Sequence, residues 1–76
     1  MIRVKLYGLL RLDSGIKEKQ LDAGSVKEVL RALEACGISK KNLNGSIILI
    51  NGAAASKHSK LKDGDVVQLL SPVAGG

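Results

Sequence analysis

The clearest chemical potential of this sequence lies in its last six residues, Ser71-Pro72-Val73-Ala74-Gly75-Gly76. Gly75 and Gly76 carry no side chains, so their backbone can enter a narrow channel and approach another protein closely. Pro72 cannot donate a sheet hydrogen bond, and it stiffens the exit from the strand expected before it. The carboxylate of Gly76 is a poor electrophile, but joining it to AMP makes an acyl adenylate. A sulfur nucleophile can then displace the AMP.

The rest of the sequence offers no catalytic set for this chemistry. His58 is the only histidine and lies in a polar stretch, where a solvated loop is expected. Cys36 is the only cysteine, and we expect it to pack as a small hydrophobe beside a helix and not to act as a nucleophile. The Asp-Gly-Asp at residues 63–65 is typical of a turn. We therefore expect this chain to have no catalytic residues, metal or bound cofactor of its own, so a partner must supply the chemistry.

The length and composition of the chain limit the class of protein that it can be. A chain of 76 residues forms one domain, and 45% hydrophobic with 25% charged residues is typical of a globular protein. One cysteine cannot form an internal disulfide. The longest aliphatic run, residues 47–50, is too short to span a bilayer, and the start shows no secretory signal. We expect a cytoplasmic protein with no membrane association.

The net charge of +5 allows a nucleic acid, a phosphorylated ligand or an acidic protein as partner. Tyr7 is the only aromatic residue, so the chain lacks a platform on which bases could stack. We therefore expect no nucleic-acid partner.

The first half of the sequence predicts a hairpin and a helix. Apolar and basic residues alternate over residues 2–7, as in a half-buried strand, and a turn over residues 8–15 leads to an edge strand at 16–21. Ser25 and Glu28 form a capping box that begins a helix. That helix has an apolar stripe and ends at Gly37, and its stripe consists of Val26, Val29, Leu30 and Leu33.

The second half predicts three more strands. A polar connector at residues 38–45 precedes a strand at 46–51, whose continuous aliphatic run at 47–50 is typical of a central strand. Asn51-Gly52 is a strong signal for a two-residue hairpin turn into a short strand at 53–57. The last strand covers residues 66–71.

This order predicts an α+β fold in which a mixed sheet carries one crossing helix, the β-grasp or ubiquitin-like arrangement. We expect residues 1–71 to form the β-grasp domain and residues 72–76 to form a flexible C-terminal Gly-Gly tail.

Residues 61–76 resemble the MoaD branch of the MoaD/ThiS sulfur-carrier family. Members of this branch have a Leu-x-Asp-Gly-Asp turn, a last strand and a Pro-Pro-Val-x-Gly-Gly end. Here Ser71 replaces the first of the two prolines. Residues 4–11 and 50–56 are similar to two further segments of the family, so the resemblance covers the whole chain.

The resemblance implies a specific role. An ATP-dependent, ubiquitin-activating-type enzyme (MoeB-like) would adenylate the carboxylate of Gly76, and a sulfur donor protein would convert it to a thiocarboxylate. The tail would then enter the large subunit of molybdopterin synthase (MoaE-like) and donate sulfur to the dithiolene of molybdopterin. Gly75 would permit passage. The partner-binding residues would be Leu70, Pro72, Val73 and Ala74.

Two other functions stay open. One is a ThiS-like or ubiquitin-related carrier, which serves thiamin synthesis, tRNA thiolation or conjugation to lysines. The other is a basic β-grasp binding module. Binding by such a module would survive removal of Gly75 and Gly76, and added salt would weaken it steeply.

Overall fold

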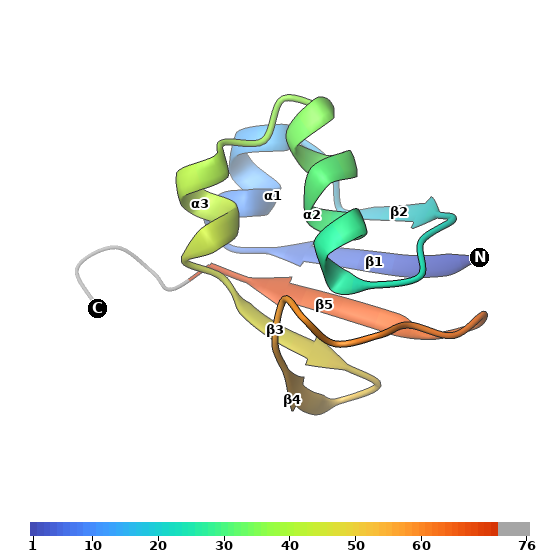
Figure 1. Ribbon diagram of the computed structural model, residues 1–76. Helices are drawn as coiled ribbons and strands as arrows, with labels where there is room; N and C mark the ends of the chain where they lie inside the picture. The colour runs from blue at the N-terminus through green and yellow to red at the C-terminus, as the bar shows by residue number, and fades with distance from the viewer. Residues whose placement is uncertain (72–76) are drawn as a thin grey trace.

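A computed structural model describes residues 1–71 of the chain. Within that part, five strands form one mixed sheet and three helices accompany it (Figure 1). In chain order the elements are β1 (Ile2–Tyr7), α1 (Leu9–Ser14), β2 (Glu18–Leu21), α2 (Val26–Ala35), α3 (Lys40–Asn44), β3 (Ile47–Ile50), β4 (Ala53–Ala55) and β5 (Val66–Leu70). The expected α+β, ubiquitin-like architecture is confirmed.

The sheet has the strand order β2-β1-β5-β3-β4. Strand β5 pairs parallel with β1 and antiparallel with β3, so the first and last strands of the described chain lie side by side. The hairpin of β1 with β2 is confirmed, with β2 at the edge as predicted. The pairing of β1 with β5 places the end of β5 next to the end of β1.

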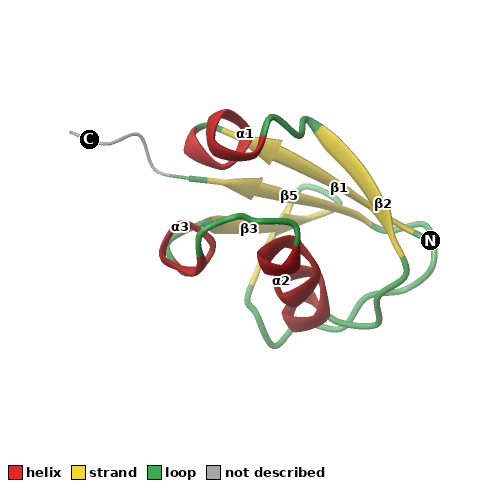
Figure 2. Cartoon of the chain, turned by 90° about the horizontal axis from the view of Figure 1, so that it is seen from above, coloured by secondary structure: helices red, strands yellow, loops and turns green. Residues whose placement is uncertain are grey.

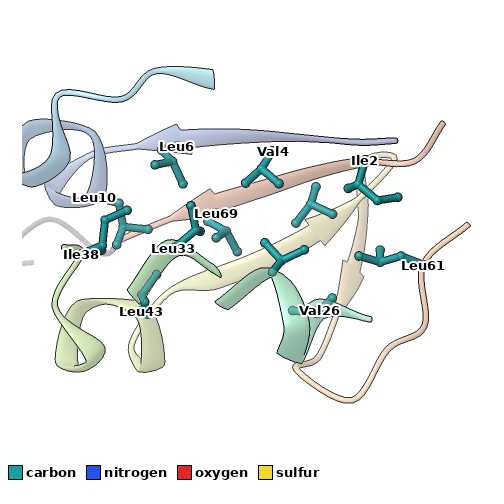
Figure 3. Close-up of a cluster of buried hydrophobic side chains, with 12 residues drawn as sticks. Ile2, Val4, Leu6, Leu10, Val26, Leu33, Ile38, Leu43, Leu61 and Leu69 are labelled. Carbon is teal, nitrogen blue, oxygen red and sulfur yellow. The ribbon is translucent and has the colours of Figure 1, made fainter. Parts of the chain in front are cut away.

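The apolar core lies between the helices and one face of the sheet. Alternate residues of β1 and β5 point into it, and each helix contributes buried side chains, as Figure 3 shows. Figure 2 shows α1 beside the end of β1 and α2 with α3 on the β3 side of the sheet. The buried apolar residues are Ile2, Val4, Leu6, Leu10, Val26, Val29, Leu33, Ile38, Leu43, Leu61, Val67 and Leu69. All of them gather on one side of the sheet, and within residues 1–71 no helix covers its other face, which we call the open face (Figure 2).

Helix α2 begins as the capping box predicts. The Ser25 hydroxyl accepts a hydrogen bond from the Glu28 amide, and the Glu28 carboxylate accepts one from the Gly24 amide. The predicted apolar stripe is buried at three positions and half-buried at Leu30. Past the end of the helix, Gly37 has a φ of +99°, the left-handed conformation expected of a terminating glycine.

Two segments that we expected to be irregular are helices. The predicted turn at residues 8–15 contains α1, whose Leu10 is fully buried in the core. The predicted connector at residues 38–45 contains α3, whose Leu43 is buried as well. Each helix has fewer than two turns, too few for a periodic apolar pattern to stand out in the sequence. Burial of one leucine in each stabilises a helix that is too short to be stable alone.

Strand β3 differs from the prediction in its burial. It is an interior strand between β5 and β4, but β5 holds the middle of the sheet. Ile48 and Ile50 pack against the core, whereas Ile47 is 54% exposed and Leu49 is half-buried. The continuous aliphatic run of β3 therefore serves two faces of the sheet. Ile48 and Ile50 face the helices, and Ile47 and Leu49 form part of the open face. The predicted Asn51-Gly52 turn is confirmed by positive φ at both residues, +51° and +84°.

Within residues 1–71, no helix has the length and apolar character needed to cross a bilayer.

Candidate functional site

The candidate site lies on the open face of the sheet, at the end where β1 and β5 finish and β3 begins. The strand register puts three side chains in one row across these strands, because Leu70 pairs with Tyr7 on one side and with Ile47 on the other. We call these three residues the apolar row. It lies directly before residues 72–76, which belong to the predicted tail.

The apolar row is accessible to a partner. Tyr7 is 36% exposed and Ile47 is 54% exposed, while Leu70 between them is half-buried. Side chains pointing away from the core alternate with buried ones, so these three point away from the helices. The Gln68 side-chain amide donates a hydrogen bond of 3.2 Å to the Tyr7 hydroxyl. This bond holds the aromatic ring beside β5, and the row forms a preformed apolar surface.

Ser71 ties the end of β5 to the turn between β1 and α1. Its hydroxyl accepts a hydrogen bond of 2.5 Å from the Leu9 amide and lies 3.4 Å from the Tyr7 carbonyl oxygen, to which it donates. The side chain is largely buried, with 9% of the residue exposed. The Leu9 amide is at the first position of α1, where the helix itself offers no acceptor. Ser71 therefore anchors the point from which the predicted tail departs.

Gly8 makes this anchor possible. Its φ is +63°, and a Cβ built on it would lie 2.6 Å from the Ser71 hydroxyl oxygen and 3.0 Å from the Ser71 carbonyl oxygen. Both the backbone conformation and the close approach require glycine. Gly8 and Ser71 follow the paired residues Tyr7 and Leu70, so the parallel register brings them together.

Of the predicted site residues, the structure places Leu70 in the apolar row. Gly76, Gly75, Pro72, Val73 and Ala74 lie outside the described residues.

Sequence reasoning missed the contributions of Tyr7, Ile47 and Gly8, and it noted Ser71 only as a replacement for proline. The sequence did contain one signal for this surface. Tyr7 and Ile47 are large apolar residues at strand positions whose side chains point away from the core. Their proximity to the end of β5 depends on the strand order, which the sequence does not encode locally.

The two shifted pKa values of the described residues belong to the opposite end of the sheet. The backbone amide of Lys62 and the side-chain amide of Asn51 donate to the Asp65 carboxylate at 2.8 and 3.0 Å, and these bonds lower its pKa. A hydrogen bond to the Asp63 carboxylate raises the pKa of the amino group of Met1. Neither charge lies at the apolar row.

The other chemically distinctive side chains lie apart from the apolar row. His58 is exposed in the turn after β4, as expected. The expectation that Cys36 is packed is wrong, because Cys36 is exposed at the end of α2. The Lys19 ammonium donates to its sulfur at 3.3 Å. Within residues 1–71, no three His, Cys, Asp or Glu side chains come together as metal ligands.

The fold is the ubiquitin-like fold of ThiS/MoaD-type sulfur carriers. The chain belongs to the ThiS family, which it matches over residues 4–76. No curated protein sequence gives a significant match.

Solved structures share this fold. A chain of the complex of subunits 1 and 2 of the molybdopterin-converting factor from Helicobacter pylori is 29% identical, with a TM-score of 0.74. That match covers 99% of this chain and 97% of the other. SAMP1 from Haloferax volcanii is 24% identical, with a TM-score of 0.80 and coverage of 99% and 98%. A chain of the BexX/CysO complex from Amycolatopsis orientalis is 21% identical, with a TM-score of 0.74 and full coverage of both chains.

Proposed function

We propose that this chain is a sulfur carrier that serves as the small subunit of a molybdopterin synthase. The carboxylate of Gly76 is adenylated and then thiocarboxylated, and the sulfur passes to the dithiolene of molybdopterin. The chain supplies no catalytic residue of its own. It presents Gly76 to an ATP-dependent MoeB-like enzyme and then to a MoaE-like large subunit, with sulfur supplied by a donor protein. The cytoplasm remains the expected compartment.

The observation that carries this proposal is the family match, because it extends over residues 4–76 and so includes both Gly75 and Gly76. The molybdopterin branch is favoured by the Pro-Val-Ala-Gly-Gly end of the sequence. The likeness to a chain of a molybdopterin-converting factor, at 29% identity, supports the same branch.

The apolar row gives the partners a place to bind. A flat surface of three apolar side chains beside the start of the tail suits an enzyme that must hold the domain while it reaches Gly76. We assign Leu70 to this contact. We propose that Pro72, Val73 and Ala74 contact the walls of the partner's channel that the tail enters. Gly75 allows passage because it has no side chain.

The proposed activation and sulfur transfer need no group of this chain other than the Gly76 carboxylate. The Gly76 carboxylate oxygen attacks the α-phosphate of ATP, and pyrophosphate leaves. Hydrosulfide then attacks the acyl carbon, a C–S bond forms, the bond to the phosphate oxygen breaks, and AMP departs. The product differs from the starting protein by one sulfur in place of one oxygen.

The intact mass of the full chain tests the proposal directly. The protein is incubated with ATP, sodium sulfide and a MoeB-like adenylating enzyme. We expect a mass increase equal to the exchange of one oxygen for sulfur, and we expect it to be absent when Gly76 is deleted. An unchanged mass with several adenylating enzymes would refute the carrier function. Transfer of the sulfur to a pterin precursor in the presence of a MoaE-like subunit then tests the molybdopterin branch.

A matched pair of leucine substitutions tests the docking role. We expect Leu70→Ala to raise the KM of the adenylating enzyme for this protein about tenfold, as loss of an interface anchor does. Leu12→Ala removes the same atoms from a side chain that is 80% exposed on α1, outside the apolar row, and is the control. Equal KM values for the two variants would exclude Leu70 from the interface.

The alternative carrier use is protein modification or sulfur transfer to thiamin or tRNA. Protein modification is the use named in the description of one H. volcanii neighbour with the same fold, small archaeal modifier protein 1. The two uses differ in the product formed from activated Gly76. A modifier forms an amide with lysine side chains of other proteins, which appears as a heavier band that resists thiols.

A further inference from the structure

A groove runs along the helix-bearing side of the molecule. Two adjoining hollows, with volumes of about 320 and 510 Å3, share Leu30, Leu43, Asn44 and Lys57 in their walls. Figure 1 shows α2 and α3 next to each other, with β3 and β4 below them. These elements and the turn after β4 line the groove. No residue of β1 or β5 takes part within the described chain.

The groove has an apolar floor and a basic rim. Leu30 and Ile48, which are half-buried, supply the aliphatic surface, and the buried Leu43 lies beneath it. Four basic side chains stand around the first hollow, with one acidic neighbour, Glu34. The basic side chains are Lys27, Arg31, Lys40 and Lys57. The rim thus carries a net charge of +3, more than half of the +5 of the whole chain.

The basic side chains of the rim form no ion pair with the part of the chain that the structure describes. The ion pairs found there join the Met1 amino group to Asp63 and Arg3 to Glu18. The carboxylates of Glu28 and Asp65 accept hydrogen bonds that cap α2 and close the turn before β5. These two carboxylates thus serve local structure away from the rim, and Glu34 is the one acidic residue that lines the first hollow within residues 1–71.

The apolar floor and the basic rim together favour a ligand that has both negative charges and apolar groups. An acidic peptide that also carries aliphatic side chains would place its carboxylates against the lysines and bury its apolar groups on Leu30 and Ile48. A single-stranded nucleic acid gains affinity by stacking on aromatic rings. The groove has none, because the only aromatic residue, Tyr7, belongs to the opposite face of the sheet.

We propose that this groove binds an acidic, aliphatic-containing segment of a partner protein. The binding does not depend on Gly75 or Gly76, and it leaves most of the apolar row uncovered. Ile47 borders both surfaces. The protein can therefore be held at the groove by one acidic segment while the apolar row stays available to another partner.

Chemical-shift mapping and fluorescence anisotropy on the full chain test the proposal. The probe is a short labelled peptide that repeats Glu-Glu-Leu, with a matched peptide that repeats Glu-Glu-Ser. We expect the leucine peptide to bind more tightly and to shift the amide signals of Leu43, Asn44 and Lys57. We expect Lys27→Glu combined with Lys40→Glu to weaken its binding at least about tenfold, because like charges then face the carboxylates.

The control is Lys17→Glu combined with Lys62→Glu, which makes the same change in net charge at exposed positions outside both hollows. We expect it to retain most of the affinity. Equal losses in the two double variants, or equal affinity for the two peptides, would overturn the proposal.

A single-stranded RNA of the same charge provides a second arm. Tighter binding of RNA than of the peptide at the same amide signals would also overturn the proposal. Deleting Gly75 and Gly76 leaves peptide binding unchanged if the groove acts alone, so this test is independent of the carrier function.

Discussion

At the scale of single residues, Gly8 and Ser71 decide where the predicted tail leaves the domain. The Ser71 hydroxyl is held by the Leu9 amide and the Tyr7 carbonyl group, and Gly8 leaves room for it. A serine in place of the first proline of the family pattern gives this chain a hydrogen-bonded anchor that a proline side chain cannot form. The exit of the tail is thereby coupled to the start of α1.

We predict that Gly8→Ala lowers the free energy of unfolding by about 1–3 kcal/mol, because it forces a residue with a Cβ into a left-handed conformation against Ser71. Gly45→Ala is the matched control. Gly45 has a φ of −87°, and a Cβ there would meet its nearest neighbour at an ordinary 3.6 Å. Urea denaturation of both variants measures the difference. Similar midpoints for the two would contradict the role assigned to Gly8.

The Asp65 carboxylate predicts a pH dependence. Its pKa lies below the usual value of 3.8, because the Lys62 amide and the Asn51 side chain donate to its charged form. Its contribution to stability is therefore fully present above pH 3.8 and is lost as the pH falls through the lower pKa of the folded state.

We expect urea midpoints of the parent and Asp65→Asn to differ at neutral pH and to converge in acid below the pKa of the folded state. Asp22→Asn removes the same charge without removing the two hydrogen bonds. A constant difference between the parent and Asp65→Asn across this range would contradict the assignment.

At the scale of elements, the described helices cover one face of the sheet. Residues of equal apolarity in the sequence are therefore buried to different extents. Leu33 on α2 is completely buried, whereas Leu49 on β3 is half-buried on the open face. The aliphatic run of β3 serves the core with one set of side chains and the open face with the other.

We predict that Leu33→Ala costs about 2–5 kcal/mol of unfolding free energy, the range for truncation of a buried leucine. Leu49→Ala removes the same atoms from the open face, and we expect it to cost about 1 kcal/mol, near the average for point substitutions. Urea denaturation of both variants gives the comparison. A Leu49→Ala cost equal to that of Leu33→Ala would indicate that the open face is covered in solution.

At the scale of the whole molecule, the sheet and the helices present two surfaces of different chemistry. The open face offers the apolar row at the point where the predicted tail begins, and the helix-bearing side offers the basic groove. Within residues 1–71, the buried apolar residues run from Ile2 to Leu69 and include side chains of all three helices and of strands β1 and β5. We therefore expect the stability of the domain to depend on these residues.

We expect removal of Gly75 and Gly76 to leave the urea midpoint within experimental error of the parent, while it abolishes the sulfur-dependent mass increase. The same variant should keep its affinity for the acidic peptide. A large loss of stability on this deletion would show that these glycines contribute to the fold. The absence of the mass increase could then result from unfolding and not from the loss of the reacting carboxylate.

The sequence by itself determined those elements whose signals are local. The capping box at Ser25 and Glu28, the stripe of α2 and the Asn51-Gly52 turn each depend on residues a few positions apart, and all three are found as predicted. The ubiquitin-like class followed from the order of these elements. The chemistry assigned to Gly76 also came from the sequence, through the resemblance of its last residues to a family.

Only the tertiary structure decided the features that join distant residues. The two short helices form because Leu10 and Leu43 enter a core built by other elements, and no pattern of their own announces them. The parallel pairing of β1 with β5 brings Gly8 to Ser71 and Tyr7 to Leu70 across more than sixty positions. The basic groove arises in the same way, since Lys27, Lys40 and Lys57 meet only when α2, α3 and the turn after β4 pack together.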